Sequence, residues 1–306
     1  MYRVRQQIDC MDEMYPIMKG KPVGVAVLDT GIGNHPDVQN RIIDFCDFVQ
    51  NKKGIYDDSG HGTHVVGCIG GNGRVSGGKY RGIHPECNFV IGKVLNADGD
   101  GNLSDMIKGF EWILNCAEKY NICVVNISVG VTSNMEQDAL ATMLELVEEA
   151  WQKNIMVVCA AGNAGPKPMS ISPLGWGKHI ITVGCHDGGY FGNRKDICEQ
   201  YSGRGPSKFA IKKPDLVAPG TDIISCNAKC HVRNRRFWGE PYIKKSGTSM
   251  ATPLVAGAAA LLIQKYGRLE CEEIKHRIIY SATDLEEPWT KQGWGMLNVR
   301  RMLTIV

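Results

Sequence analysis

One serine in this chain stands at the start of an apolar segment and has the surroundings of a nucleophile. Ser249 lies in Gly247-Thr248-Ser249-Met250-Ala251-Thr252-Pro253, and the apolar run that follows it, Leu254–Leu262, predicts a buried helix. The free N–H groups and the positive dipole end at a helix N-terminus favour negative charge beside the hydroxyl. A serine that only caps a helix looks the same. To act as a nucleophile, Ser249 needs a base and a group that orients the base.

A histidine and an aspartate upstream can supply these two groups. Asp29 follows the apolar run Val23–Leu28, which predicts a buried strand, and a carboxylate held at a strand end by backbone donors can orient an imidazole. His61 lies between Gly60 and Gly62 at a predicted helix start. The spacing of His61 and His64 is not that of a metalloprotease helix, which places its histidines at i and i+4 around a glutamate. We therefore interpret one histidine as the base, and the flanking glycines favour His61.

An asparagine completes the set of groups that acyl transfer requires. Asn163 follows a predicted strand that ends at Ala160, and its neighbours Ala161, Gly162 and Ala164 are small. An asparagine in this position often forms a turn. With small neighbours its amide N–H is free to point at an anion, as the tetrahedral intermediate of acyl transfer demands.

Short apolar runs that alternate with amphipathic helices predict the fold. The predicted strands are Val23–Leu28, Phe89–Leu95, Ile122–Ile127, Ile155–Ala160 and Ile180–Gly184. Helical patterns with one apolar face cover residues 106–117 and 140–151. This alternation indicates an α/β fold with a mainly parallel, doubly wound sheet and helices on both faces, with polar functional residues at the carboxyl ends of the strands. Residues 186–246 are richer in Gly, Pro, Arg and Lys and predict loops and an antiparallel hairpin. Without a repeat or a linker, we expect a single domain over residues 1–306.

Composition excludes several classes of protein. The formal net charge is +3, too small to indicate a partner nucleic acid, and no apolar stretch is long enough to span a bilayer. The first ten residues lack an apolar segment behind their basic residues, so we expect no secretion signal. Several of the 12 cysteines lie inside apolar runs. We therefore expect a reduced, cytoplasmic protein. Cys226 and Cys230, next to His231, are a weak zinc signal because no second ligand pair lies nearby.

Taken together, in the chain order Asp, His, Asn, Ser, these residues resemble the subtilisin family of serine proteases. The resemblance runs from near the N-terminus to about Val299. It implies that Ser249 is the nucleophile, that His61 is the general base and acid, and that Asp29 orients His61. Asn163 and the Ser249 backbone N–H would form the oxyanion hole. The residues that carry the resemblance are Val27-Leu28-Asp29-Thr30-Gly31, His61-Gly62-Thr63-His64-Val65, Ala160-Ala161-Gly162-Asn163 and Gly247-Thr248-Ser249-Met250-Ala251-Thr252-Pro253.

The resemblance also implies where a substrate would bind. Asp100-Gly101-Asn102 and Ser128-Val129-Gly130 would be the two extended edges that pair with the main chain of a peptide. The first specificity pocket would lie between the second edge and residues 164–171, beginning at Ala164, and neither segment carries a carboxylate. Leu103, Met106 and Val129 would line the pocket for the fourth residue before the cut. We expect a serine endopeptidase that forms an acyl-enzyme and broadly favours neutral, apolar residues in protein or peptide substrates.

The sequence departs from the secreted members of the family at two places. Only a short stretch precedes Asp29, which favours an intracellular member and leaves its means of control open. The loop that holds calcium in the best-known members corresponds to Gly70–Tyr80, which contains two cations and no carboxylate. We expect no cofactor in the chemistry, and calcium is possible only as a structural ion, with its usual loop not matched. The oligomeric state is left open.

Two other classes of protein fit these residues less well. An α/β-hydrolase esterase would need G-x-S-x-G around its serine and the order serine, acid, histidine. Both conditions fail, because Ala251 stands where the second glycine would be and the order is different. A non-catalytic scaffold relative would be expected to lack a member of the triad, and Asp29, His61 and Ser249 are all present.

Overall fold

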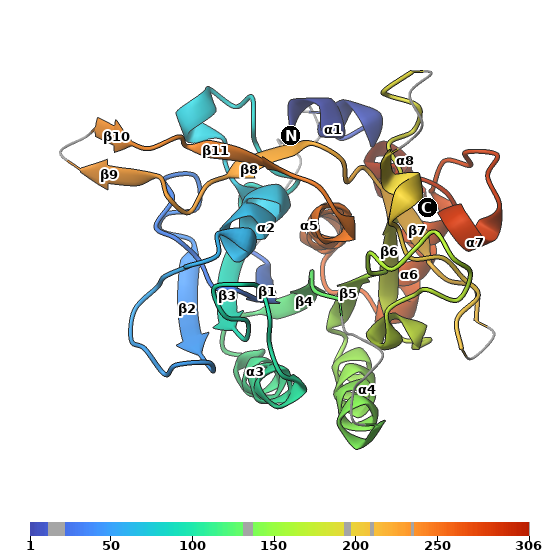
Figure 1. Cartoon of the computed structure of the whole chain (residues 1–306), viewed down its shortest axis with the longest axis horizontal. Helices are drawn as coiled ribbons and strands as arrows, with labels where there is room; N and C mark the ends of the chain where they lie inside the picture. The colour runs from blue at the N-terminus through green and yellow to red at the C-terminus, as the bar shows by residue number, and fades with distance from the viewer. Residues whose placement is uncertain (12–21, 131–136, 193–196, 209–210, 234–235, 306) are drawn as a thin grey trace.

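A seven-stranded sheet, in which every neighbouring pair of described strands is parallel, runs through the centre of this computed structural model (Figure 1). The structure describes residues 1–11, 22–130, 137–192, 197–208, 211–233 and 236–305. The strand order is β2-β3-β1-β4-β5-β6-β7. The strands are β1 (Gly24–Asp29), β2 (Ile42–Asp47), β3 (Asn88–Lys93), β4 (Ile122–Ile127), β5 (Met156–Ala160), β6 (Ile181–Cys185) and β7 (Leu216–Ala218).

Helices cover both faces of this sheet, which confirms the predicted doubly wound α/β fold. Helices α3 and α4 pack on one face, and α2 and α5 pack on the other (Figure 1). The four helices are α2 (His61–Gly70), α3 (Leu103–Cys116), α4 (Gln137–Gln152) and α5 (Thr248–Tyr266). Further helices among the described residues are α1 (Tyr2–Gln7), α6 (Cys271–Tyr280), α7 (Trp289–Gln292), α8 (Val299–Thr304) and the 3₁₀ turns η2 (Arg74–Ser76), η3 (Pro173–Trp176) and η4 (Ile197–Gln200). No helix among the described residues is both long and apolar enough to cross a bilayer.

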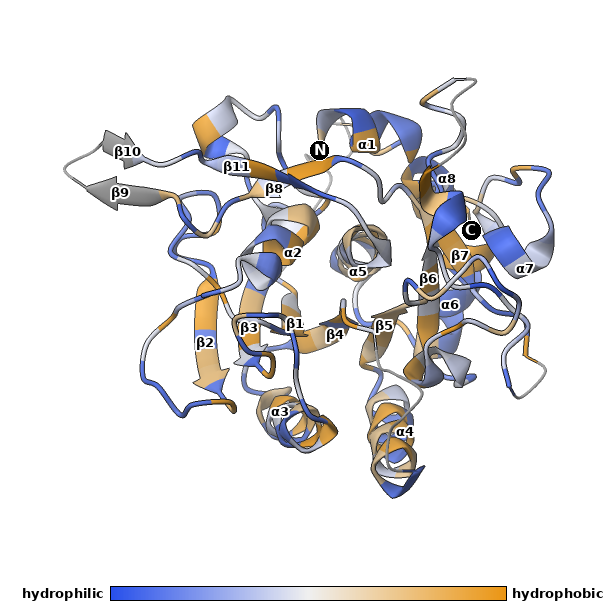
Figure 2. Ribbon diagram, viewed as in Figure 1, coloured by the Kyte–Doolittle hydropathy of each residue, from blue (hydrophilic) through white to orange (hydrophobic). Residues whose placement is uncertain are grey.

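The core is divided by the sheet into two layers, and the alternation of side chains along β1 shows why. Val25 and Val27 belong to the cluster under α2 and α5, whereas Ala26 and Leu28 belong to the cluster under α3 and α4. Successive residues of a strand point to opposite faces, so a strand covered on both sides must be apolar throughout. Apolar residues accordingly run along the central strands (Figure 2).

Helix α5 is buried along nearly its whole length, from Met250 to Gln264. A helix that is apolar all round belongs inside a protein, and α5 lies against β4, β5 and β6 and against α2. Small residues make this close packing possible. A Cβ added to Gly257 would lie 2.8 Å from Ile83 Cβ and 2.9 Å from the Ile69 carbonyl oxygen.

The structure differs from the sequence-based expectation for two strands. Strand β2 was not predicted, and five of its six residues are only half-buried, because β2 is an edge strand and lacks the continuous apolar run of a central one. Leu216–Ala218 was expected among loops and a hairpin but forms β7, the last parallel strand, buried throughout. The predicted antiparallel pairing is confirmed further on, where β8 (Ile223–Cys226) pairs with β11 (Tyr242–Lys245) and β9 (His231–Arg233) pairs with β10 (Arg236–Trp238).

The expectation that all cysteines are free is wrong for one pair in this structure. Cys185, at the end of β6, and Cys198, in η4, are joined by a disulfide that spans 13 residues. Their approach brings two segments together that the sequence pattern does not relate. Cys226 and Cys230, the other pair noted in the sequence, are both buried and free.

The packing of α5 leads to a stability prediction. Gly257→Ala should destabilise the fold by about 1–3 kcal/mol, because the added methyl group overpacks the α2–α5 contact and outweighs the better helix propensity of alanine. Urea unfolding of the variant measures this. Gly177→Ala is the matched control, since the nearest atoms to its added Cβ lie at an ordinary 3.6 Å. An unchanged or raised stability of Gly257→Ala would contradict the predicted overpacking.

Candidate active site

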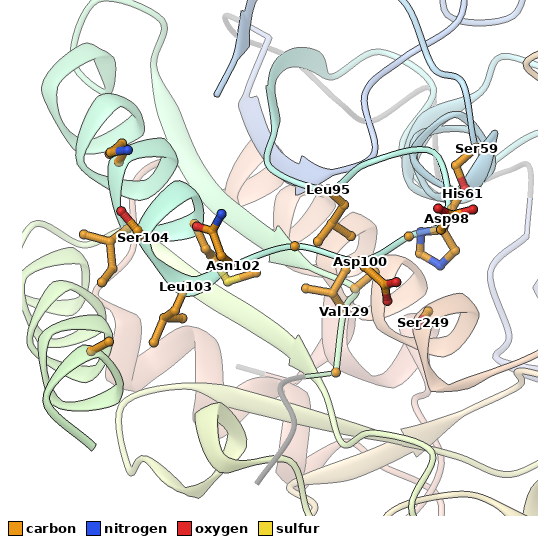
Figure 3. A pocket seen from close by; sticks show the side chains of 18 of the residues that line it. Ser59, His61, Leu95, Asp98, Asp100, Asn102, Leu103, Ser104, Val129 and Ser249 are labelled. Atoms are coloured by element: carbon orange, nitrogen blue, oxygen red, sulfur yellow. The ribbon is translucent and has the colours of Figure 1, made fainter. Parts of the chain in front are cut away.

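The predicted catalytic residues come together at one edge of the sheet. Asp29 is the last residue of β1, Asn163 follows β5, His61 begins α2 and Ser249 lies in the first turn of α5. The carboxyl ends of parallel strands meet at the same edge, and ligands bind where the winding direction changes. Here the chain winds from β1 to β2 and β3 on one side and continues through β4 on the other. His61 and Ser249 line the same pocket (Figure 3).

Asp29 and His61 form a hydrogen-bonded pair. The His61 Nδ1 lies 2.7 Å from Asp29 Oδ1, and the same oxygen accepts a 2.7 Å hydrogen bond from the Thr30 N–H. Asp29 is fully buried. Burial of His61 lowers its pKa, but the attraction and hydrogen bond of Asp29 outweigh this effect, so the pKa of His61 is raised above 6.5. With Nδ1 bound to Asp29, Nε2 is the ring nitrogen left to exchange a proton in the pocket.

Hydrogen bonds between the β1 turn and the α2 N-terminus fix the position of this pair. Asp57 accepts hydrogen bonds from the Thr63 N–H at 2.8 Å and from Thr30 Oγ1 at 2.8 Å, and Thr30 Oγ1 accepts one from the Gly62 N–H at 2.9 Å. A carboxylate at a helix N-terminus satisfies donors that have no partner within the helix. A side chain at Gly62 would collide with the Gly31 carbonyl oxygen. The glycines beside His61 thus allow α2 to begin directly against the turn.

A buried lysine joins three segments around the same turn. The Lys93 ammonium donates 2.7 Å hydrogen bonds to the carbonyl oxygens of Thr30 and Leu95 and to Asp58 Oδ1. Lys93 is fully buried, and its three donors are therefore matched by three acceptors. It connects the residue after Asp29 to the segment that enters the pocket at Leu95.

His64, the second histidine of the motif, has a structural role. It is fully buried, and its Nε2 lies 2.9 Å from the Ile223 carbonyl oxygen. Burial lowers the pKa of His64 to about 3, so the ring is neutral. It does not line the pocket in which His61 lies. Its interaction with β8 instead attaches α2 to the β8–β11 ribbon.

Two hydrogen-bond donors converge beside Ser249. Thr248 donates to Asn163 Oδ1 from its N–H at 3.1 Å and from its hydroxyl at 3.0 Å, which leaves Asn163 Nδ2 to face outward. The position that a Cβ of Gly247 would occupy lies 3.5 Å from Asn163 Nδ2 and 3.7 Å from the Ser249 N. Gly247 also has a φ of +145°, which only glycine readily adopts. The absence of a side chain therefore leaves space between two donors, as an oxyanion site requires.

The pocket has a volume of about 1090 Å³, and eight of the nine predicted substrate-binding residues line it. Ala164 does not, although it directly follows Asn163. A Cβ at Gly130 would lie 4.0 Å from Gly162 Cα, so the segment ending at Gly130 and the one carrying Asn163 are neighbours. The eight are Asp100, Gly101, Asn102, Leu103, Met106, Ser128, Val129 and Gly130.

Sequence reasoning missed several residues that line this pocket. Asp98 lies just before the predicted edge, Ala139 comes from α4, and Lys245 comes from the end of β11. For Lys245, the one sequence feature that could have indicated its position in the pocket is that it lies shortly before Ser249 in the chain. The contribution of α4 depends on helix packing, and no local pattern indicates it.

Comparison with known proteins shows the family of this chain. Residues 20–295 match the sequence model of the subtilase family. The chain is 40% identical over 292 residues to the serine protease AprX of Bacillus subtilis, and the match covers 92% of this chain and 66% of AprX. It is 34% identical over 281 residues to Subtilisin BL of Lederbergia lenta, with 92% and 90% covered. The chain belongs to the subtilase family.

A solved structure supports the same assignment. The crystal structure of a cold adapted subtilisin-like serine proteinase matches with a TM-score of 0.69 at 28% identity, over 90% of this chain and 88% of that one. The predicted resemblance and fold are therefore confirmed, and this subtilase has the fold and relatives of a serine endopeptidase.

The loop of this subtilase from Gly70 to Tyr80 does not fit a calcium ion. Its side-chain oxygens are already engaged, because Asn72 Oδ1 accepts from the Arg74 N–H at 2.9 Å and the Ser76 hydroxyl donates to the Gly73 carbonyl oxygen at 3.0 Å. Backbone hydrogen bonds close the loop, including Gly78 N–H to the Gly73 carbonyl oxygen at 2.9 Å. Calcium prefers six or more oxygens, commonly with carboxylates among them, and this loop offers none.

Two buried groups of possible metal ligands occur among the described residues, and each is engaged otherwise. One is Cys185, Asp187 and Cys198, in which the cysteines form the disulfide. The other is His35, Asp37 and Cys226. His35 Nδ1 accepts from the Asp37 N–H at 3.1 Å, and its Nε2 lies 2.8 Å from the Pro241 carbonyl oxygen. The side chain of His231 lies outside the described residues, so the zinc hypothesis there is not addressed.

The raised pKa of His61 predicts the pH dependence of activity. A base must be neutral, and a pKa above about 6.5 means that activity is lost as the pH falls through that raised value. Asp29→Asn should lower kcat by about 10⁴-fold, the loss known for the same change in a serine protease triad. It should also move the acid limb of kcat/KM to lower pH, because the attraction that favours the imidazolium is removed. An unmoved limb would show that another group sets it.

Proposed function

We propose that this subtilase cleaves peptide bonds through an acyl-enzyme formed on Ser249. The observation that carries the proposal is the Asp29–His61 hydrogen bond, which leaves Nε2 of the ring for the pocket that Ser249 shares. Ser249 Oγ attacks the carbonyl carbon while its proton passes to His61 Nε2. The developing oxyanion accepts hydrogen bonds from Asn163 Nδ2 and the Ser249 N–H.

The second half of the reaction uses the same groups. The protonated His61 gives its proton to the leaving amine as the C–N bond breaks, and the acyl group stays on Ser249 as an ester. A water molecule then loses a proton to His61 and attacks the ester, which releases the acid and restores the serine. Asp29 holds the ring of His61 through Nδ1 and stabilises the imidazolium in both halves.

The nucleophile and the oxyanion donor can be tested with one pair of variants. Ser249→Ala should abolish peptide hydrolysis and labelling by a fluorophosphonate probe while the protein unfolds at the same temperature, because a hydroxyl at a helix start contributes little packing. Asn163→Ala should keep probe labelling but lower kcat by about 10²- to 10³-fold with little change in KM, a magnitude adopted from the equivalent donor of subtilisin. Residual peptidase activity equal to wild type in Ser249→Ala would reject the proposal.

The lining of the pocket supports a preference for apolar residues before the cut. Leu103, Met106 and Val129 lie together on the pocket wall with Leu95 and Ile107. Burial of a leucine or phenylalanine there would contribute about 1.5–3 kcal/mol. The predicted first specificity pocket, between residues 128–130 and 164–171, has no carboxylate in either segment, so a buried lysine or arginine from a substrate would be left unpaired at a cost.

We therefore expect broad endopeptidase activity with neutral, apolar residues at the position before the cut and again three positions further upstream. Mass-spectrometric cleavage profiling on a mixed peptide library measures this, and Met106→Lys should weaken the preference at the upstream position alone. Strict cleavage after arginine or lysine would overturn the pocket assignment and leave the triad untouched.

Two further proposals concern ions and location. We propose that no cofactor takes part in the chemistry and that the Gly70–Tyr80 loop holds no calcium, because this loop has no carboxylate and its Asn72 and Ser76 side-chain oxygens are already engaged. EDTA should then leave kcat unchanged and lower the unfolding temperature only slightly. We also propose a cytoplasmic location. The Cys185–Cys198 disulfide opposes it, and alkylation of thiols in freshly lysed cells, which counts the reduced cysteines, is the measurement that decides.

A further inference from the structure

We propose that Lys245 makes this protease favour substrates with an acidic side chain shortly after the cleaved bond, on the part that leaves as the amine. The inference rests on the proposed function and extends it to the leaving-group side of the pocket. It depends on three observations: the direction of the Lys245 side chain, the absence of a bonded partner for its charge among the described residues, and the distribution of charge around the pocket.

The first observation is the direction of two neighbouring lysines. Lys244 and Lys245 end β11, paired with Ile224 and Ile223 of β8. Successive strand residues point to opposite faces, and the ammonium of Lys244 lies 3.2 Å from Asp222 Oδ2. Lys245 instead lines the pocket together with His61 and Ser249.

The second observation is that the Lys245 charge has no counterpart within the described part of the protein. None of its described neighbours forms a hydrogen bond or ion pair with the ammonium, whereas the buried Lys93 and Lys213 are each fully bonded. Lys245 is half-buried. Its charge also acts on the catalytic ring. Burial lowers the pKa of His61 and Asp29 raises it, and the Lys245 cation lowers it by a smaller amount. A cation close to the reacting groups is thus available to a substrate.

The third observation is the arrangement of charge around the pocket. The predicted acyl-side edges are residues 100–102 and 128–130, and the first edge leads into α3. Asp100 belongs to this edge, whereas Asp98 lies beside His61 at the catalytic end of the pocket (Figure 3). Strand β11 and helix α3 lie on opposite sides of α2 (Figure 1). A peptide that follows the two edges to Ser249 therefore passes toward Lys245 after the cleaved bond.

Charge complementarity then selects the substrate. A glutamate or aspartate after the bond meets an unpaired cation, and a lysine there is repelled. On the acyl side Asp100 disfavours acidic residues, so the preference has a direction along the peptide. Because Lys245 is half-exposed, attraction and repulsion together should change kcat/KM by about 3- to 10-fold between Glu and Lys, and salt should reduce the difference.

The test uses peptides with one constant acyl half and Glu, Gln or Lys at the first or second position after the cut. Wild type, Lys245→Met and Lys245→Glu are compared at a pH well above the acid limb, in low and high salt. Lys244→Met is the matched control, since it removes a cation from the same strand that points to Asp222 instead of the pocket. Thermal unfolding verifies that each variant is folded.

The expected result is a Glu-to-Lys ratio of kcat/KM of about 3 to 10 in wild type and Lys244→Met. The ratio should be near 1 in Lys245→Met, inverted in Lys245→Glu and reduced by salt in wild type. A wild-type ratio near 1, or a ratio that survives Lys245→Met, would overturn the inference.

A chromogenic amide with the same acyl half and no amino acid after the bond separates the two proposals. If wild type hydrolyses it but shows no charge preference with the peptides, only the role of Lys245 fails. If wild type does not hydrolyse it or any of the peptides, the proposed function fails, and the inference fails with it.

Discussion

The buried carboxylate of Asp29 is the interaction on which the active centre depends. A fully buried charge is costly unless hydrogen bonds compensate it. Here Oδ1 of Asp29 interacts with both the Thr30 N–H and the ring of His61, whereas Oδ2 is buried without a hydrogen-bond partner among the described residues. Burial follows from β1, which is covered on both faces and ends at Asp29. The hydrogen bond between Asp29 and His61 therefore constrains where α2 can begin, and Asp57 and Lys93 add hydrogen bonds that hold the turn after β1 against α2 and the Leu95 segment. Stability of the fold and orientation of the base have the same physical origin.

Helix α5 connects the core to the nucleophile in a similar way. Its apolar residues bury it against the sheet, so its position is set by packing over almost its whole length. Its N-terminus then reaches the edge where Asp29 lies. The Gly247 N–H donates to the Gly220 carbonyl oxygen at 2.9 Å, and this bond fixes the turn before Ser249. Because a well-packed core deforms little, the hydroxyl and the oxyanion donors keep their relative positions.

Lysines in this protein serve two different purposes, which burial and bonding distinguish. Lys93 and Lys213 are fully buried, and every donor has an acceptor, including the 2.6 Å contact of Lys213 with Asp215. Such residues join segments of the fold. Lys245 is half-buried at the pocket wall and has no bonded partner among the described residues. A charge left in this state close to a reacting centre is more useful for recognition than for stability.

The sequence by itself determined five of the seven central strands, the helices between them and the four candidate catalytic residues. These features are encoded locally, since a strand buried on both faces must be a continuous apolar run, and the glycines at Gly62 and Gly247 allow close backbone approach. The edge strand β2 and the short strand β7 were not predicted. A half-buried strand lacks a continuous apolar run, and a strand of three residues is too short to show one. Only the tertiary structure decided that Lys245, Asp98 and Ala139 share a pocket with Ser249, that Ala164 does not line it, and that Cys185 meets Cys198. Each of these depends on how separate elements pack, and the distance between elements is a property of the whole core that no single segment carries.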